Sequence, residues 1–290
     1  MRVVITGSTG FIGARLSGIL RESGAEVVSL GRHASADYRW EAASDAPAAA
    51  FEQADAVIHL AGEPVMQRWT AEARQRMRDS RVIGTERLIQ GLSIARNRPK
   101  TLICASAVGY YGDRGEESLN EHAEPGTGFL PGLCREWEAT ADLAQSLGMQ
   151  VVKVRIGIVL GENGGALKQM LPPFKAGVGG RVGSGRQWMP WIHIDDICGI
   201  FRHALDGRFS GVLNGTAPGI VRNAEFTSAL AARLHRPAIL PVPRFALKIM
   251  FGEVGGVLVW SQRVVPEVTV NTGYRFRHPE LGPALASLKL

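Results

Sequence analysis

The chain has 290 residues, 45% hydrophobic and 21% charged, which suits one large α/β domain, or one domain with a smaller lobe, around a sizeable core. Its net charge of +6 comes from scattered arginines without a Lys/Arg run or interleaved aromatic residues, which argues against nucleic-acid binding. No apolar run reaches the ~20 residues that a membrane span needs, so we expect no membrane partner. Three cysteines, an odd and sparse set, favour a reducing compartment, and we expect a cytoplasmic protein.

Residues 2–31 are the most informative segment. "RVVIT" predicts a buried parallel strand, a glycine-rich turn follows, and Leu16, Ile19 and Leu20 predict a helix that ends at Gly24. "AEVVSL" predicts a second strand. Glycines let the backbone approach a pyrophosphate, to which the helix N-terminus offers free N–H groups. We therefore predict a dinucleotide site with this turn: Gly7, Ser8, Thr9, Gly10, Phe11, Ile12 and Gly13.

The end of the second predicted strand bears on the choice of cofactor. Proteins that bind NAD carry an Asp or Glu there, which binds the ribose 2′-hydroxyl. This chain has Gly31 and Arg32 instead. A guanidinium suits a 2′-phosphate, although a solvent-exposed surface arginine is the alternative interpretation. We predict binding of NADP(H) in preference to NAD(H).

Strands and helices continue to alternate along the chain. Residues 55–64, 100–112 and 149–161 predict strands, and residues 70–95 and 133–148 predict helices. This alternation predicts an α/β, Rossmann-like, doubly wound parallel sheet over residues 1–160. Residues 161–290 are expected to form a smaller C-terminal substrate lobe, with some segments returning to the sheet. Within that lobe, residues 222–243 predict a helix and a strand, and residues 248–266 an apolar, helix-like segment.

Six motifs, which follow one another along the chain, carry a resemblance to a known family: the glycine turn, "HLA" at residues 59–61, "RVIGT" at 81–85, "CASAVGYYG" at 104–112, residues 155–161, and "WIHIDD" at 191–196. Together they resemble the extended short-chain dehydrogenases/reductases of the NAD-dependent epimerase/dehydratase family. Within that family they look like an atypical YfcH-type subgroup of nucleoside-diphosphate-sugar epimerases. The resemblance implies a nicotinamide cofactor and adds these residues to its site: Leu60, Ala61, Gly62, Arg81 and Arg155.

The segment "CREWE" departs from the family. Ordinary members carry Tyr-x-x-x-Lys there, in which the lysine lowers the pKa of the tyrosine that exchanges a proton with the substrate. Here Cys134 and Glu138 keep the spacing. An ionised Glu138 facing the thiol would raise its pKa above ~8.5 and oppose thiolate formation. Cys134 is therefore either a catalytic thiol or a small residue packed beneath the cofactor.

Other residues could supply the missing acid or base. Tyr110 and Tyr111 follow the strand where a substrate is expected, and Ser106 adjoins the family's serine position, which Ala107 could also occupy. Glu63 follows the cofactor-facing loop. Each also has a plain structural explanation, as a packing residue or a rim carboxylate. With Cys134, these residues form the candidate catalytic set.

The segment at residues 177–196 is glycine-rich but lacks the G-K-[ST] of a P-loop. Arg186 is available for an anionic substrate group, and His193 is a second candidate substrate residue. His193 with Asp195 and Asp196 lacks further ligands, so no metal site is predicted.

We expect a small-molecule substrate, and a homodimer is possible. Two functions remain open: an epimerase or reductase acting on a nucleotide sugar or another small carbonyl or alcohol, and a non-catalytic NADPH-binding regulatory or interaction protein.

Overall fold

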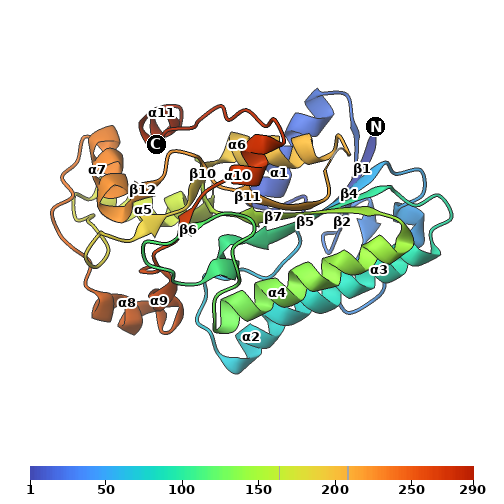
Figure 1. Cartoon of the computed structure of the whole chain (residues 1–290), viewed down its shortest axis with the longest axis horizontal. Helices are drawn as coiled ribbons and strands as arrows, with labels where there is room; N and C mark the ends of the chain where they lie inside the picture. Colours follow the sequence, from blue (N-terminus) through green and yellow to red (C-terminus); the bar gives the residue numbers. More distant parts are fainter. Residues whose placement is uncertain (163, 208) are drawn as a thin grey trace.

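The computed structural model describes residues 1–162, 164–207 and 209–290. A parallel sheet of seven strands, in the order β11-β7-β5-β4-β1-β2-β3, runs through the centre of the molecule (Figure 1). This arrangement confirms the predicted Rossmann-like α/β fold. The strands span Arg2–Thr6 (β1), Glu26–Gly31 (β2), Tyr38–Arg39 (β3), Ala56–His59 (β4), Thr101–Ala107 (β5), Gln150–Ile156 (β7) and Gly211–Gly215 (β11).

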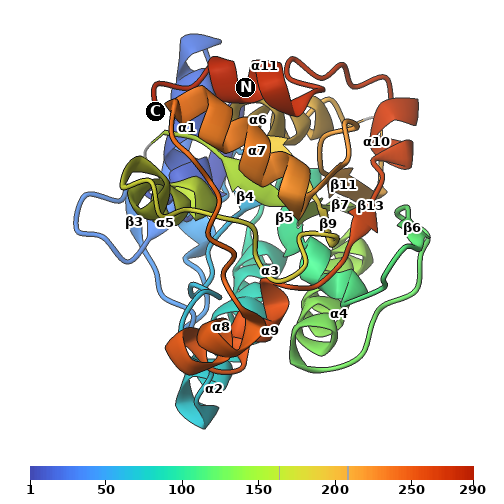
Figure 2. The same cartoon turned by 90° about the vertical axis from the view of Figure 1, so that its left-hand side faces the viewer.

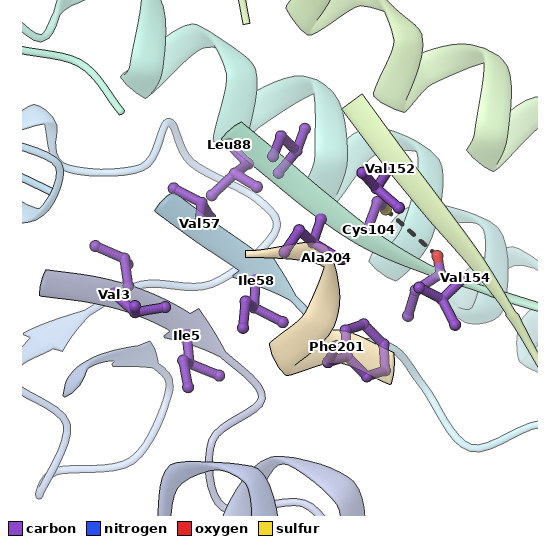
Figure 3. Close-up of a cluster of buried hydrophobic side chains, with 14 of the residues drawn as sticks. Val3, Ile5, Val57, Ile58, Leu88, Cys104, Val152, Val154, Phe201 and Ala204 are labelled. Carbon is purple, nitrogen blue, oxygen red and sulfur yellow. Dashed lines mark hydrogen bonds between the residues drawn. The ribbon is translucent and has the colours of Figure 1, made fainter. Parts of the chain in front are cut away.

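Helices cover both faces of the sheet. α1 (Phe11–Glu22) and α6 (Ile194–Ala204) lie on one face, and α3 (Gly84–Ile94) and α4 (Phe129–Asp142) lie on the other (Figure 1). Neighbouring side chains of β4 point to opposite faces: Ile58 lies beside Phe201 of α6, and Val57 beside Leu88 of α3 (Figure 3). Because both faces are buried, the strands are continuous apolar runs instead of alternating patterns.

The helix predicted over residues 70–95 is interrupted. The structure has α2 (Ala71–Arg78), a π-helical turn η2 (Asp79–Ile83) and then α3. A π turn accommodates more residues than an α turn and often marks a functional position. The other predicted helix also differs, since α4 begins at Phe129 and is followed by a 3₁₀ turn, η4 (Leu143–Leu147).

The strand predicted over residues 149–161 breaks at Gly157. β7 stays in the main sheet, whereas β8 (Ile158–Leu160) pairs with β10 (Trp191–His193). A Cβ atom at Gly157 would lie 2.3 Å from the carbonyl oxygen of Pro190, so only glycine fits where the two sheets meet.

After this break the chain forms α5, α7, α8 and α9, which lie to one side of the main sheet (Figure 2). The helix predicted within residues 222–243 is confirmed as α7 (Asn223–Leu234), but the strand expected after it is wrong, because residues 236–243 form only an isolated bridge between Val242 and Val182. The remaining elements of the chain are the 3₁₀ turns Ala48–Ala50 (η1) and Val108–Tyr111 (η3), and β6 (Ser118–Leu119), α5 (Gly165–Lys175), β9 (Trp188–Met189), β12 (Val221–Arg222), α7 (Asn223–Leu234), α8 (Arg244–Phe251), α9 (Val254–Val257), β13 (Arg263–Val264), α10 (Glu267–Asn271) and α11 (Leu281–Ala286).

Two buried carboxylates attach the C-terminal segment to the rest of the fold. Glu121 accepts hydrogen bonds from the backbone N–H groups of Asn214, Val268 and Thr269. Asp196, which is fully buried, accepts from the backbone N–H groups of Arg277 and His278. Each acid therefore compensates its burial with several donors.

Within the part of the chain that the structure describes, none of the helices combines the length and the apolar character required to cross a membrane.

Candidate cofactor and active site

A cleft of about 840 Å³ opens at the carboxyl ends of β1, β2 and β4. In sheets of this kind, ligands bind at these strand ends. The cleft is lined by the glycine turn, by the end of β2 and by the loop after β4. Of the predicted cofactor residues, these line it: Gly7, Ser8, Thr9, Gly10, Gly31, Arg32, Leu60, Ala61 and Gly62.

The glycine turn has a shape that fits a dinucleotide. Gly7 has a φ of +70°, and a Cβ atom there would lie 2.9 Å from the backbone nitrogen of Ala61. A Cβ atom at Gly13 would lie 2.1 Å from the carbonyl oxygen of Gly7. Gly10 is the N-cap of α1 and offers no side-chain cap, so the N–H groups of the first helical turn are available to a phosphate.

Three residues of the predicted turn, Phe11, Ile12 and Gly13, lie behind the cleft and do not line it. The ring of Phe11 packs beneath Gly164, where a Cβ atom would lie 2.4 Å from the ring. The carbonyl oxygen of Ile12 faces the thiol of Cys198, and Gly13 allows the close approach described above. These three residues would therefore contribute to the predicted site through the backbone N–H groups of the first turn of α1 and not through their side chains.

A buried hydrogen-bond chain connects the glycine turn to the helices below it. The hydroxyl of Thr6 accepts from the backbone N–H groups of Leu60 and Ala61, and lies 2.6 Å from Nδ1 of His59. With its acceptor positions used, Thr6 donates its proton to His59. Nε2 of His59 then donates to Thr85, 3.1 Å away.

The same chain of hydrogen bonds ends at residues of α4 and η2. The hydroxyl of Thr85 also accepts from Nε1 of Trp137 at 3.1 Å, and it donates to the carbonyl oxygen of Arg81. Burial lowers the pKa of His59 to about 4, so the ring is neutral, as this pattern requires. The cofactor turn and the "CREWE" helix are therefore held in one fixed arrangement.

The opposite end of the cleft contains residues that the sequence pattern did not reveal. His33 and Ser35 follow Arg32 there, and Trp40 also lines the cleft, with its ring centroid 6.3 Å from that of His59. Trp40 is buried, and its Nε1 donates to the carbonyl oxygen of Ser44. A strand of two residues, β3, holds this segment, and such a short strand has no periodic signal from which it could be predicted.

Cys134 is a buried, protonated thiol. It is 3% exposed, and burial, followed by the charge of Glu138, raises its pKa to about 12. The sequence argument attributed the raised pKa to the carboxylate, but desolvation contributes more. General acid/base catalysis at neutral pH needs a group that titrates near pH 7, and this thiol does not.

Glu138 does not take the place of the family's lysine, because Arg155 occupies both of its oxygens. Nε and Nη2 of Arg155 donate to Oε1 and Oε2 of Glu138, each at 2.8 Å. Ser106 donates to the same Oε1 at 2.6 Å. Burial lowers the pKa of Arg155, but the hydrogen bonds and charge of Glu138 outweigh burial and leave it raised.

This network corrects three expectations. Nη1 of Arg155 is bonded to the hydroxyl of Tyr111 and the carbonyl oxygen of Glu121, so every nitrogen of this buried guanidinium already donates within the protein, and Arg155 does not line the cleft. Tyr111 is fully buried, its hydroxyl lies 2.7 Å from Oδ1 of Asn214, and burial raises its pKa to about 12. Ser106 is also buried, so Ser106 and Tyr111 are structural residues.

Two candidates remain accessible to a ligand. Tyr110 is partly buried, and its ring lies over the guanidinium of Arg155, with 3.4 Å from Cζ to the ring centroid. Burial raises the pKa of Tyr110. Glu63 lines the cleft and is paired with Arg76 at 3.5 Å.

The two predicted substrate residues are separated. Arg186 is exposed on the loop before β9. His193 is 3% exposed and caps α6, because its Nδ1 accepts from the backbone N–H of Asp195 at 3.1 Å. His193 therefore cannot contact a substrate.

His193, Asp195 and His278 have ligand atoms within 4.8 Å of one another, a grouping that the sequence did not show. However, a neutral His193 whose Nδ1 accepts a hydrogen bond carries its proton on Nε2, which faces the hydroxyl of Ser287 at 3.3 Å. Asp195 is already paired with Arg15 at 2.8 Å. This donor arrangement does not fit a metal ion.

Comparison with known proteins agrees with this geometry. Residues 3–215 match the NAD dependent epimerase/dehydratase family, and residues 242–288 match a domain of unknown function, DUF1731. An Arabidopsis thaliana protein described as the chloroplastic homologue of epimerase family protein SDR39U1 is 38% identical over 301 residues, which cover 99% of this chain and 86% of that protein.

Solved structures that are similar over 99% of this chain include the following two. The human epimerase family protein SDR39U1 with NADPH is 37% identical, with a TM-score of 0.91 and 99% of its own chain covered. A nucleoside-diphosphate sugar epimerase from Corynebacterium glutamicum is 33% identical, with a TM-score of 0.81 and 57% of its chain covered. The fold, the glycine turn and these matches agree, and the chain belongs to the NAD-dependent epimerase/dehydratase family, among the SDR39U1-type proteins.

Proposed function

We propose that this protein binds NADP(H) in preference to NAD(H) in the cleft above β1, β2 and β4. One observation carries the proposal: Gly31 and Arg32 stand at the rim, where an acid would be required for NAD. His33 and Ser35 add polar groups beside Arg32. The human relative crystallised with NADPH supports the same choice.

For the reaction, we propose an epimerase- or reductase-like activity on a nucleotide sugar or another small carbonyl or alcohol. Such an activity would use Tyr110 or Glu63 for proton transfer, because Cys134, Ser106 and Tyr111 are buried. Arg186, which is exposed, is the candidate group for an anionic part of the substrate. A cytoplasmic location and a homodimer are part of this proposal.

A second function, a non-catalytic NADPH-binding regulator, is favoured by a different observation. Each group that replaces the family's proton relay is buried or paired inside the protein. Loss of general acid/base catalysis removes about 10²–10⁴-fold of rate.

One experiment distinguishes these functions. Epimer or oxidation products of UDP-sugars would be followed by NMR with NADP⁺ present, and NADPH oxidation would be followed with simple carbonyls, for the unmodified protein and for Tyr110→Phe. Turnover that Tyr110→Phe reduces at least about tenfold, with unchanged NADPH affinity, supports the enzyme. NADPH binding without turnover of any compound in the set supports the regulator. Calorimetry that shows no binding of either nicotinamide nucleotide would refute both.

A further inference from the structure

Arg81, in the π-helical turn η2, does not line the cleft but lies behind its inner end. The turn places Ser80 on the cleft wall, where its hydroxyl accepts from the backbone N–H of Glu63 at 2.9 Å. The guanidinium of Arg81 lies directly behind Gly62: a Cβ atom at Gly62 would be 3.1 Å from its Cζ. Gly62 itself lines the cleft, so only a backbone separates Arg81 from it.

The positive charge of Arg81 has no carboxylate partner among the described residues. Its side chain makes one long hydrogen bond, from Nη1 to the carbonyl oxygen of Met77 at 3.4 Å, and lies over the ring of Trp137 at 5.1 Å. The two acids nearby have their own cations. Glu63 pairs with Arg76 at 3.5 Å, and Glu138 pairs with Arg155 at 2.8 Å.

Arg81 lies at the end of the cleft that would receive the nicotinamide. Arg32 marks the adenosine end, beside β2, and the pyrophosphate belongs at the N-terminus of α1. The sheet order β5-β4-β1-β2 puts the loop after β4 on the opposite side of β1 from the end of β2. A dinucleotide must therefore extend from β2 towards Gly62 and Arg81.

The two redox forms of the cofactor differ in charge at this end. The nicotinamide ring carries a positive charge in NADP⁺ and none in NADPH. In this chain the pair Glu138–Arg155 is neutral as a unit, and Cys134 is a neutral thiol. The charge of Glu63 also acts on Arg81, but Arg76 pairs with Glu63, so these side chains together keep one net positive charge, which repels only the oxidised ring.

We propose that Arg81 makes the cleft selective for the redox state of the cofactor, so that the protein binds NADPH in preference to NADP⁺. This inference rests on the proposed NADP(H) site and adds a discrimination that either function could use. A regulator would respond to the ratio of the two forms, whereas a reductase would release its oxidised cofactor readily after each turnover.

The test compares dissociation constants for NADPH and NADP⁺ by calorimetry in three variants and the unmodified protein. The unmodified protein should bind NADPH roughly tenfold more tightly, the size expected from a unit charge several ångströms away in a medium of intermediate dielectric constant. Arg81→Met should bring the two affinities within about threefold of each other, mainly because NADP⁺ binds better. Arg81→Lys, which keeps the charge, should retain the preference.

Arg78→Met is the matched control, because Arg78 is on the neighbouring helical turn and pairs with Glu136 on the surface. The ratio of its dissociation constants for NADPH and NADP⁺ should equal that of the unmodified protein. The fragment 2′,5′-ADP, which lacks the nicotinamide, should bind Arg81→Met unchanged, which shows an intact adenosine end. If Arg81→Met does not fold, Arg81→Gln replaces it.

Equal affinities for NADPH and NADP⁺ in the unmodified protein would overturn the inference but leave the proposed NADP(H) site in place. The inference would also be overturned if Arg81→Met left the ratio of the two dissociation constants unchanged. The same holds if Arg81→Lys abolished the preference for NADPH as fully as Arg81→Met does. Failure of the folded protein to bind either form would instead refute the proposed function.

Discussion

Arg155 and Glu138 form a bidentate ion pair, with both N–O distances at 2.8 Å and side chains only 4% and 9% exposed. The pair joins β7 to α4 beneath the place where the family has its proton relay. A buried charge that loses its partner is costly, because no water replaces the lost interaction. Glu138 is therefore required to balance the buried charge of Arg155.

The first prediction follows from this pair. Glu138→Gln should lower the free energy of unfolding by about 3–5 kcal/mol, since it leaves the guanidinium of Arg155 buried without a counter-charge. Glu136→Gln, in the same helix, removes an exposed partner of Arg78 and should cost less than about 1 kcal/mol. Urea unfolding monitored by circular dichroism measures both, and equal losses would contradict the prediction.

The glycine turn supports a second prediction, in which two similar changes have different effects. Gly13→Val should destabilise the fold, because its Cβ atom would lie 2.1 Å from the carbonyl oxygen of Gly7. At Gly10 the nearest protein atom is 3.2 Å from the added Cβ, so Gly10→Val should fold with a modest loss of stability. However, its side chain would occupy the pyrophosphate position, and NADPH binding should be lost. A folded Gly10→Val protein with unchanged NADPH affinity would place the cofactor elsewhere.

Cofactor preference gives a third prediction. Arg32→Asp should weaken NADPH binding by at least about tenfold, through loss of a charge-assisted contact and repulsion of the 2′-phosphate. The same carboxylate can accept from the ribose 2′-hydroxyl, so NADH binding should improve or stay unchanged. Calorimetry with both nucleotides provides the comparison. Equal affinities for NADPH and NADH in the unmodified protein would refute the basis of this prediction.

The buried thiol gives a fourth prediction, about alkaline pH. The pKa of Cys134 is about 12 in the folded protein and 9.0 when unperturbed. A raised pKa means that the stability contributed by the neutral thiol is complete below about pH 9 and is lost as the pH rises towards 12. This one group contributes a slope of at most about 1.4 kcal/mol per pH unit.

Cys134→Ala removes that slope, so its stability should fall less steeply than that of the unmodified protein between pH 9 and 11. The NADPH affinity of this variant should remain nearly unchanged. Urea unfolding at several pH values tests the first statement and calorimetry the second. Parallel pH profiles of stability for the two proteins would show that the thiol is ionised in the folded protein. A robust turnover that Cys134→Ala abolishes would show that the thiol is catalytic.

The cofactor turn was predictable from the sequence because its determinants are local: a strand, glycines at fixed spacing and a helix within residues 2–31. The partner of Glu138 was not. The i, i+4 spacing placed Cys134 and Glu138 on one helix face, but only the parallel register that pairs Ser106 with Arg155 brings the guanidinium beneath that face.

The π turn at Arg81 was missed for a different reason. A π turn and an α turn differ in backbone hydrogen bonding, and the apolar spacing of residues 70–95 predicts a helix in both cases. Tyr111 shows the same limit, because its neighbour Tyr110 has the same chemistry and only the fold decides which of the two is buried.

The buried carboxylates Glu121 and Asp196 have a consequence for how the chain can be divided. Each acid holds backbone of the C-terminal segment, and β11, from the same half, completes the main sheet. A fragment ending near residue 160 would lose an edge strand and leave Glu121 without its donors. The two lobes are therefore regions of one cooperative unit, and heating should produce a single calorimetric transition in which both melt together.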